Sequence, residues 1–156
     1  MPITASIPAF DPLSIPISGT NLIEASAGTG KTYGIAALFT RLVVLEQMPV
    51  ESILTVTFTK AATAELKTRL RARLDEVLQA LESVEDTDNL SDDLAAYCQD
   101  NHPGDVFLTG LLKQALVQES RARLIVRLKA AIGQFDNAAI YTIHGFCQRI
   151  LRDYAF

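Results

Sequence analysis

Two glycines, a lysine and a threonine are closely spaced near the start of the chain, in a pattern that could bind phosphate. Gly28 and Gly30 can adopt backbone angles that turn their amides towards an anion. Lys31 could reach the β- and γ-phosphates of a nucleotide, and the Thr32 hydroxyl could bind a Mg²⁺ ion that bridges them. The predicted nucleotide-binding residues are Ala25, Ser26, Ala27, Gly28, Thr29, Gly30, Lys31 and Thr32. Ala25 stands where the usual pattern has its first glycine, a position that needs only a small residue.

A strand should precede this loop and a helix should follow it. Residues 21–25 form a short, mostly apolar run that predicts the strand, and the pattern from about residue 30 to 45 predicts the helix. Such a helix would direct its positive dipole end at the bound phosphates. Four of the six prolines fall within the first 16 residues, so residues 1–20 are expected to be an extended lead-in.

Two further strands and several helices are predicted downstream. The β-branched run at residues 53–58 and the run at residues 138–142 read as buried strands. The strand–helix–strand order at the start of the chain predicts a βαβ unit, an α/β fold and a parallel sheet. Helical periodicity predicts helices at residues 60–84, 91–98 (capped by Ser91), 105–118, 120–135 and 143–156. The last helix has an apolar face on which Phe146 and Cys147 are expected in the core.

Hydroxyl and aromatic side chains follow the second and third predicted strands. The strand at residues 53–58 leads into Thr57, Phe58 and Thr59. The strand at residues 138–142 leads into Thr142 and His144. Ligands of open parallel sheets bind at the carboxyl ends of the strands. Hydroxyls and helix N-termini suit phosphate groups, and exposed aromatic rings suit stacked bases, so these segments could line a single-stranded nucleic acid. Plain alternatives are that Thr57 simply ends a strand, that Phe58 lies in the core, and that His144 is structural.

These three segments, in this order, resemble motifs I, Ia and the threonine-histidine motif of UvrD-like superfamily 1 DNA helicases. With the lead-in Asp11-Pro12-Leu13, they are similar to the RecB family, the β subunits of exodeoxyribonuclease V. The resemblance implies a P-loop NTPase (RecA-like) fold: a partial parallel sheet with flanking helices and a helical insert. It also implies an ATP-driven helicase and nuclease that repairs double-strand breaks with RecC-like and RecD-like subunits.

The same resemblance assigns roles and a domain layout. ATP and Mg²⁺ would bind at residues 25–32. Single-stranded DNA, reached from duplex ends, would bind at Thr57, Phe58, Thr59, Thr142 and His144. The chain would be the N-terminal part of motor domain 1A, with a lead-in (1–20), a phosphate-loop unit (21–80), a helical insert (81–137) and a third strand and helix (138–156).

A complete catalytic set is not expected in this chain. ATP hydrolysis needs a carboxylate that ends an apolar strand, but the Asp75-Glu76 pair lies inside the predicted long helix and is expected on a solvated face. We therefore expect a piece of a longer helicase that binds nucleotide weakly, without unwinding DNA or sustaining ATP turnover.

Charge is strongly segregated along the chain, although the net charge is only −4. Residues 60–73 and 121–129 are basic, whereas residues 82–105 hold eight acids and no Lys or Arg. Each basic run could be a nucleic-acid patch or simply a solvated helix face. No apolar run is long enough to cross a bilayer and no signal peptide is evident, so no membrane association and a cytoplasmic location are expected.

Two alternatives remain open at this stage. A small P-loop kinase could have this length, with Arg121, Arg123 and Arg127 as its lid, but it leaves the two helicase-like segments unexplained. A non-catalytic assembly module with a vestigial phosphate loop is the other alternative.

Overall fold

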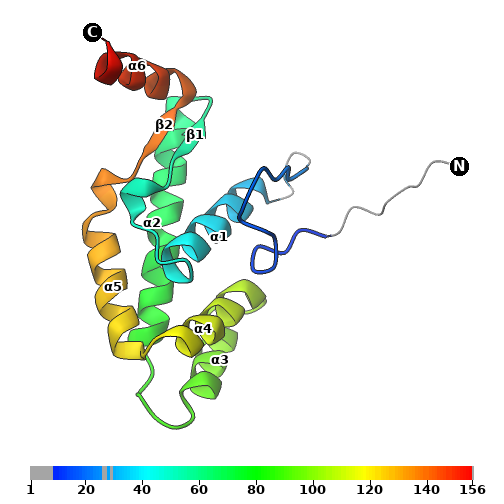
Figure 1. Ribbon diagram of the computed structural model, residues 1–156. Coiled ribbons are helices and arrows are strands. Elements are labelled where there is room, and N and C mark those ends of the chain that lie inside the picture. The colour runs from blue at the N-terminus through cyan, green and yellow to red at the C-terminus, as the bar shows by residue number, and fades with distance from the viewer. Residues whose placement is uncertain (1–8, 26–27, 29, 156) are drawn as a thin grey trace, which may run out of the picture.

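Long helices dominate the structure, and two short strands interrupt them. The computed structural model describes residues 9–25, 28 and 30–155. Its α-helices and strands, in chain order, are α1 (Lys31–Val44), β1 (Thr55–Thr57), α2 (Lys60–Glu82), α3 (Leu90–Asn101), α4 (Val106–Gln118), α5 (Arg121–Gly133), β2 (Ile140–Thr142) and α6 (Ile143–Tyr154). Short 3₁₀ turns at Val50–Ser52 and Phe135–Asn137 precede the two strands. Figure 1 shows α2 running the length of the molecule between α1 and α5.

The helix α2 is the spine of the fold because its apolar residues recur at helical spacing. Leu66, Leu70, Leu74, Val77 and Leu81 are all buried along one stripe. The predicted helix at residues 60–84 is therefore confirmed, as are those for α1, α4 and α5 to within two residues. The predicted helix at 91–98 begins earlier, at Leu90, with Asn89 rather than Ser91 as its N-cap, and it ends at Asn101.

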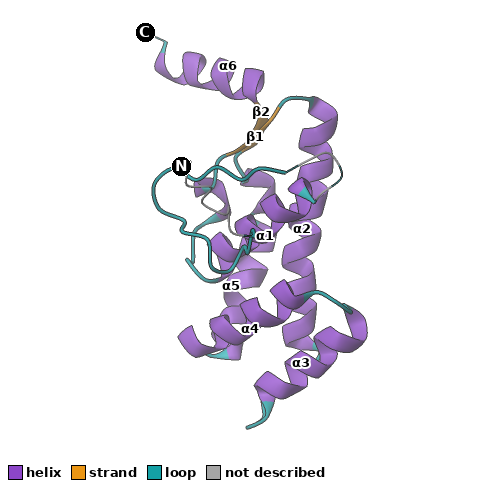
Figure 2. Cartoon of the chain, turned by 90° about the vertical axis from the view of Figure 1, so that its right-hand side faces the viewer, coloured by secondary structure: helices purple, strands orange, loops and turns teal. Residues whose placement is uncertain are grey.

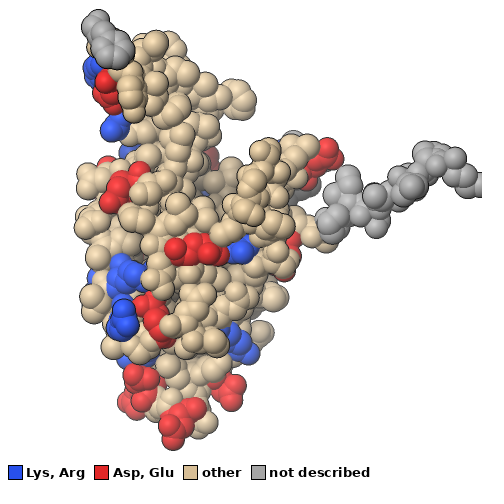
Figure 3. Space-filling model, viewed as in Figure 1, with Lys and Arg blue, Asp and Glu red and all other residues tan. Residues whose placement is uncertain are grey.

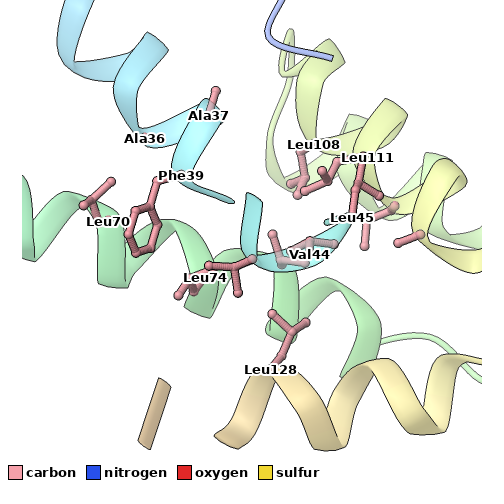
Figure 4. Close-up of a cluster of buried hydrophobic side chains, with 14 of the residues drawn as sticks. Ala36, Ala37, Phe39, Val44, Leu45, Leu70, Leu74, Leu108, Leu111 and Leu128 are labelled. Carbon is pink, nitrogen blue, oxygen red and sulfur yellow. The ribbon is translucent and has the colours of Figure 1, made fainter. Parts of the chain in front are cut away.

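One apolar core joins α1 to the helices that follow α2. Figure 4 shows Phe39 and Val44 of α1 beside Leu70 and Leu74 of α2, with Leu128 of α5 nearby. Leu108 and Leu111 of α4 belong to the same cluster and have no exposed surface. The ring of Phe39 also packs edge-on against Phe135, with the ring centres 6.1 Å apart. The helix that follows the predicted phosphate loop is thus packed against α4 and α5 as well as α2.

The two strands pair in parallel, as their order in the sequence predicts. Thr55, Val56 and Thr57 of β1 lie opposite Ile140, Tyr141 and Thr142 of β2. The chain segment from α2 to α5 forms the crossover between them. Both strands are shorter than predicted, since residues 53–54, 58 and 138–139 lie outside the ladder.

The strand predicted at residues 21–25 is wrong. These residues have no regular structure, and the sheet in the described part of the chain has two strands. The Asn21 side-chain amide donates to the carbonyls of Pro16 (2.8 Å) and Ser18 (3.3 Å), which holds the segment against the lead-in. Leu22 is 83% exposed and no strand precedes α1 in the described residues, so the predicted βαβ unit around α1 does not form here.

The helix α6 forms as predicted, but its apolar face is not in the core. No residue of Ile143–Tyr154 is buried; Cys147 is exposed and Phe146 is half-buried against Tyr141. In both Figure 1 and Figure 2, α6 extends away from the helical body at the far end of the strands. An amphipathic pattern specifies which face is apolar, but it does not specify what covers that face.

Charged side chains on the surface follow the segregation in the sequence. On the face seen in Figure 3, acidic side chains gather at the lower tip, where Figure 1 places the connection from α2 to α3. Among the described residues, no helix combines the length and apolar content needed to span a bilayer.

Candidate nucleotide and nucleic-acid site

The two segments with hydroxyl and aromatic side chains meet at one edge of the sheet. Thr57 lies directly opposite Thr142 in the parallel register of β1 and β2. Because both strands end there, Phe58 and Thr59 lie at the same edge as His144. The prediction that the two segments come together is therefore confirmed, although they lie far apart in the sequence.

Two helix N-termini open at this edge. The Thr59 hydroxyl accepts a hydrogen bond from the Ala62 N–H (3.1 Å) and caps α2. The Thr142 hydroxyl accepts one from the Gly145 N–H (3.0 Å) and caps α6 in the same way. The other N–H groups of a first turn have no partner within their helix, and they carry the positive end of its dipole. The arrangement can therefore bind phosphate groups.

The turn after β1 leaves its aromatic residue in solvent. The Thr57 hydroxyl lies 2.6 Å from the Thr63 hydroxyl and donates to the Thr59 carbonyl (3.1 Å), so Thr57 holds the turn in place. Phe58 is 90% exposed, which excludes the alternative that it lies in the core. His144 is also exposed, one residue into α6. An exposed ring beside two helix N-termini is suited to base stacking next to phosphate binding.

The predicted phosphate loop is described at both ends. Gly28 (φ +78°) and Gly30 (φ +87°) adopt left-handed backbone angles, as predicted for a loop that turns its amides inward. Gly30 is the N-cap of α1, so Lys31 and Thr32 lie in the first helical turn. The Lys31 ammonium donates to the Ala25 carbonyl at 2.7 Å, across the loop. The predicted residues Ser26, Ala27 and Thr29 lie outside the described residues.

A cavity of about 300 Å³ lies beside the loop. Lys31 and Glu24 are its charged lining residues, and most of its remaining lining is apolar, including Phe10 and Ile35. A mainly apolar pocket with a few polar groups is typical of sites for small organic ligands.

The basic runs are partly structural. Arg73 is 8% exposed and pairs with Asp105 and Glu76. At this position the basic run at residues 60–73 is therefore neither a nucleic-acid patch nor a solvated helix face. Glu76, expected on a solvated face, keeps 36% of its side-chain surface exposed while it pairs with Arg73. Arg127 donates to the carbonyls of Val43 and Val44 and pairs with Glu119. These bonds cap the C-terminal end of α1.

Arg121 is also engaged in structure. Its Nε donates to the Leu81 carbonyl at 2.7 Å. With Arg127 bound at the end of α1, two of the three arginines that a kinase lid would use hold backbone carbonyls instead.

A polar cluster near the first turn of α1 was not predicted. The Tyr33 hydroxyl donates to Asp105 (3.3 Å), which also pairs with Arg73. Burial alone would raise the pKa of Asp105, but hydrogen bonds from Arg73 and the Leu108 N–H outweigh it and lower the pKa. Burial and the nearby Asp105 carboxylate raise the pKa of Tyr33. The one sequence signal was the position of Asp105 before a helical pattern, which predicts a cap and not an ion pair.

Comparison with known proteins points to one family. A family model described as the UvrD/REP helicase N-terminal domain matches residues 11–156. The RecBCD enzyme subunit RecB of Haemophilus influenzae is 42% identical over 154 residues, covering 94% of this chain and 12% of that protein. The RecB subunit of Escherichia coli is 41% identical over 157 residues, covering 94% and 11%. That of Mycolicibacterium smegmatis is 37% identical over 141 residues, covering 90% and 11%. The chain thus spans about a ninth of the length of these relatives.

Proposed function

We propose a function that proceeds from one premise: this chain belongs to the UvrD/REP helicase family. It is the N-terminal, nucleotide-binding part of a RecB-like subunit, an ATP-dependent DNA helicase and exonuclease that acts in double-strand break repair and recombination. The observation that carries this proposal is the register of β1 and β2. It puts the two predicted DNA-binding segments at one sheet edge, with a helix N-terminus behind each.

Residues 25–32 bind ATP together with Mg²⁺ in this proposal. The positive φ of Gly28 and Gly30 and the position of Lys31 at the start of α1 support an anion site, because such glycine angles allow backbone amides to turn inward near an ammonium group. Bound Mg·ATP supplies the free energy of phosphoanhydride hydrolysis. Lys31, which donates to the Ala25 carbonyl, would hold the phosphates, and the Thr32 hydroxyl would hold the Mg²⁺ ion of the nucleotide complex.

Single-stranded DNA lies along the edge formed by Thr57, Phe58, Thr59, Thr142 and His144. The N-terminal turns of α2 and α6 bind its phosphates, and Phe58 stacks on a base. Thr57, Thr59 and Thr142 act mainly through the turn and the two caps that they hold, since their hydroxyls are already bonded to protein.

The relatives' name, RecBCD enzyme subunit RecB, supports a multisubunit assembly. We propose RecC-like and RecD-like partners, DNA duplex ends as the entry point and a cytoplasmic location. Residues 1–156 correspond to the first part of motor domain 1A, with residues 81–137 as its helical insert. The isolated chain neither unwinds DNA nor sustains ATP turnover, because the described residues include no strand that ends in an acid pair.

The central test is nucleotide binding by the 156-residue chain. Titration with a fluorescent ATP analogue and Mg²⁺ should show binding that Lys31→Ala weakens at least tenfold. Lys113→Ala, which removes an exposed lysine of α4, is the matched control and should bind like the wild type. Equal binding by the Lys31→Ala chain would contradict the nucleotide site. DNA-stimulated ATP hydrolysis by the pure chain would contradict its proposed inactivity.

A further inference from the structure

Three polar side chains from separate elements meet beside the first turn of α1. Tyr33 comes from α1, Arg73 from the middle of α2, and Asp105 from the N-cap of α4. Asp105 accepts from the Tyr33 hydroxyl at 3.3 Å and pairs with Arg73 Nη1 at 2.5 Å. We refer to these three residues as the Tyr33–Arg73–Asp105 cluster.

The arginine of this cluster lies near two aromatic rings. Its guanidinium lies 5.7 Å from the ring centre of Tyr33 and 5.3 Å from that of Phe107. Arg73 Nη1 also pairs with Glu76 at 2.7 Å, while Nε and Nη2 are buried without a hydrogen-bond partner in the described part of the chain. A buried cation held through one nitrogen depends strongly on its carboxylate partners. Arg73 therefore keeps Asp105, and with it the start of α4, close to Tyr33.

Tyr33 follows Lys31 and Thr32 directly, in the same helical turn. The N–H groups of that turn, together with Lys31, are those proposed to bind phosphate. On its loop side the turn is connected to Ala25 through the bond from Lys31. On its other side, the hydroxyl and ring of Tyr33 attach it to Asp105 and Arg73. The orientation of the turn is thus set by residues of α2 and α4.

We infer that the Tyr33–Arg73–Asp105 cluster positions the phosphate loop for nucleotide, with Tyr33, Arg73 and Asp105 as positioning residues. This inference rests on the proposed nucleotide binding by residues 25–32. It assigns the helices beyond α2 a role in that binding: through Asp105, the N-terminus of α4 holds the first turn of α1 in the conformation that a triphosphate needs. Preorganisation of this kind improves affinity because the ligand need not order the loop.

The test is Tyr33→Phe, which keeps the ring beside Arg73 and removes only the hydroxyl. Hydrogen exchange of the full chain without ligand, read by mass spectrometry, should show faster exchange of the amides of residues 31–36. Affinity for Mg·ATP should fall roughly two- to tenfold, the range expected for one hydrogen bond. The urea midpoint should change little. Asp105→Asn should change exchange and affinity in the same direction and more strongly.

Glu119→Gln is the matched control, because the Arg127–Glu119 pair holds the opposite end of α1. In this variant, the rate of amide hydrogen exchange at residues 31–36 and the affinity for Mg·ATP should equal those of the wild type. Wild-type exchange in Tyr33→Phe, or equal acceleration in Glu119→Gln, would overturn the inference. If the wild-type chain binds no nucleotide, the proposed function of this chain fails, and the exchange experiment still decides whether the cluster holds the turn.

Discussion

Gly30→Ala separates the conformational requirement of the phosphate loop from its chemistry. Gly30 has φ +87° and ψ +23°, in the left-handed region. An added Cβ would meet nothing nearer than Tyr33 Cβ at 3.9 Å, so the substitution causes no steric overlap. The cost is therefore the intrinsic penalty of an L-residue in this region, about 1–2 kcal/mol. That penalty corresponds to a factor of roughly 5 to 30 in an equilibrium constant.

The penalty can appear in either of two measurements. If the loop keeps its conformation, urea unfolding should show a loss of about 1–2 kcal/mol in the free energy of unfolding. If the loop relaxes to negative φ, its amides turn away from the phosphates, and affinity for Mg·ATP should fall about 5- to 30-fold instead. Gly30→Asn should recover part of either loss, because asparagine tolerates the left-handed region better than alanine does.

Gly133→Ala is the matched control. Gly133 is the last residue of α5, and a Cβ there meets nothing within 4 Å. Alanine is favoured over glycine in a helix, so this variant should gain about 0.5–1 kcal/mol and bind nucleotide normally. Wild-type stability together with wild-type affinity in Gly30→Ala would refute the reasoning, because the left-handed angle would then be unnecessary.

Three further predictions address the sheet edge and the two ion-pair sites. Phe58→Ala should weaken binding of an oligo(dT) probe by about 1–3 kcal/mol, measured by fluorescence anisotropy. It should change the free energy of unfolding by less than about 0.5 kcal/mol, because the ring is 90% exposed. Unchanged DNA affinity would contradict a stacking role. Arg127→Met should cost about 3–5 kcal/mol in urea unfolding, because it leaves Glu119 and two carbonyls of α1 without their cation. A loss below about 1 kcal/mol would show that the pair is dispensable. The pKa of Asp105 is lowered in the folded chain, so its contribution to stability is fully present above the ordinary carboxyl pKa. That contribution is lost as the pH falls through the lowered pKa. The stability gap between wild type and Asp105→Asn should therefore shrink as the pH falls below about 5, and a constant gap would contradict the pairing.

Local patterns predicted most of the elements and the residues at their ends. The spacing of Leu66, Leu70 and Leu74 predicted α2, because one stripe of a helix must face the core. Thr57 and Thr142 were predicted to meet because parallel strands end at a common edge, and their register confirms it. Both expectations depend on short-range periodicity and on a general rule of sheet topology.

Side-chain roles that depend on a distant partner were mispredicted. Arg73 reads as part of a basic run, yet it is buried because Asp105, 32 positions later, is brought to it by α4. The segment at residues 21–25 reads as a strand, yet Asn21 bonds to the lead-in and not to a neighbouring strand. The apolar face of α6 reads as core, yet the described elements leave it exposed.

The sequence by itself determined where helices begin, which residues could bind phosphate, and that two hydroxyl-bearing segments end parallel strands. These properties depend on backbone preference and on residues a few positions apart. Only the tertiary structure decided which charges are buried and what holds the first turn of α1. The free energy of a buried ion pair depends on its partner and on the surrounding dielectric, and both are set by packing between elements far apart in the chain.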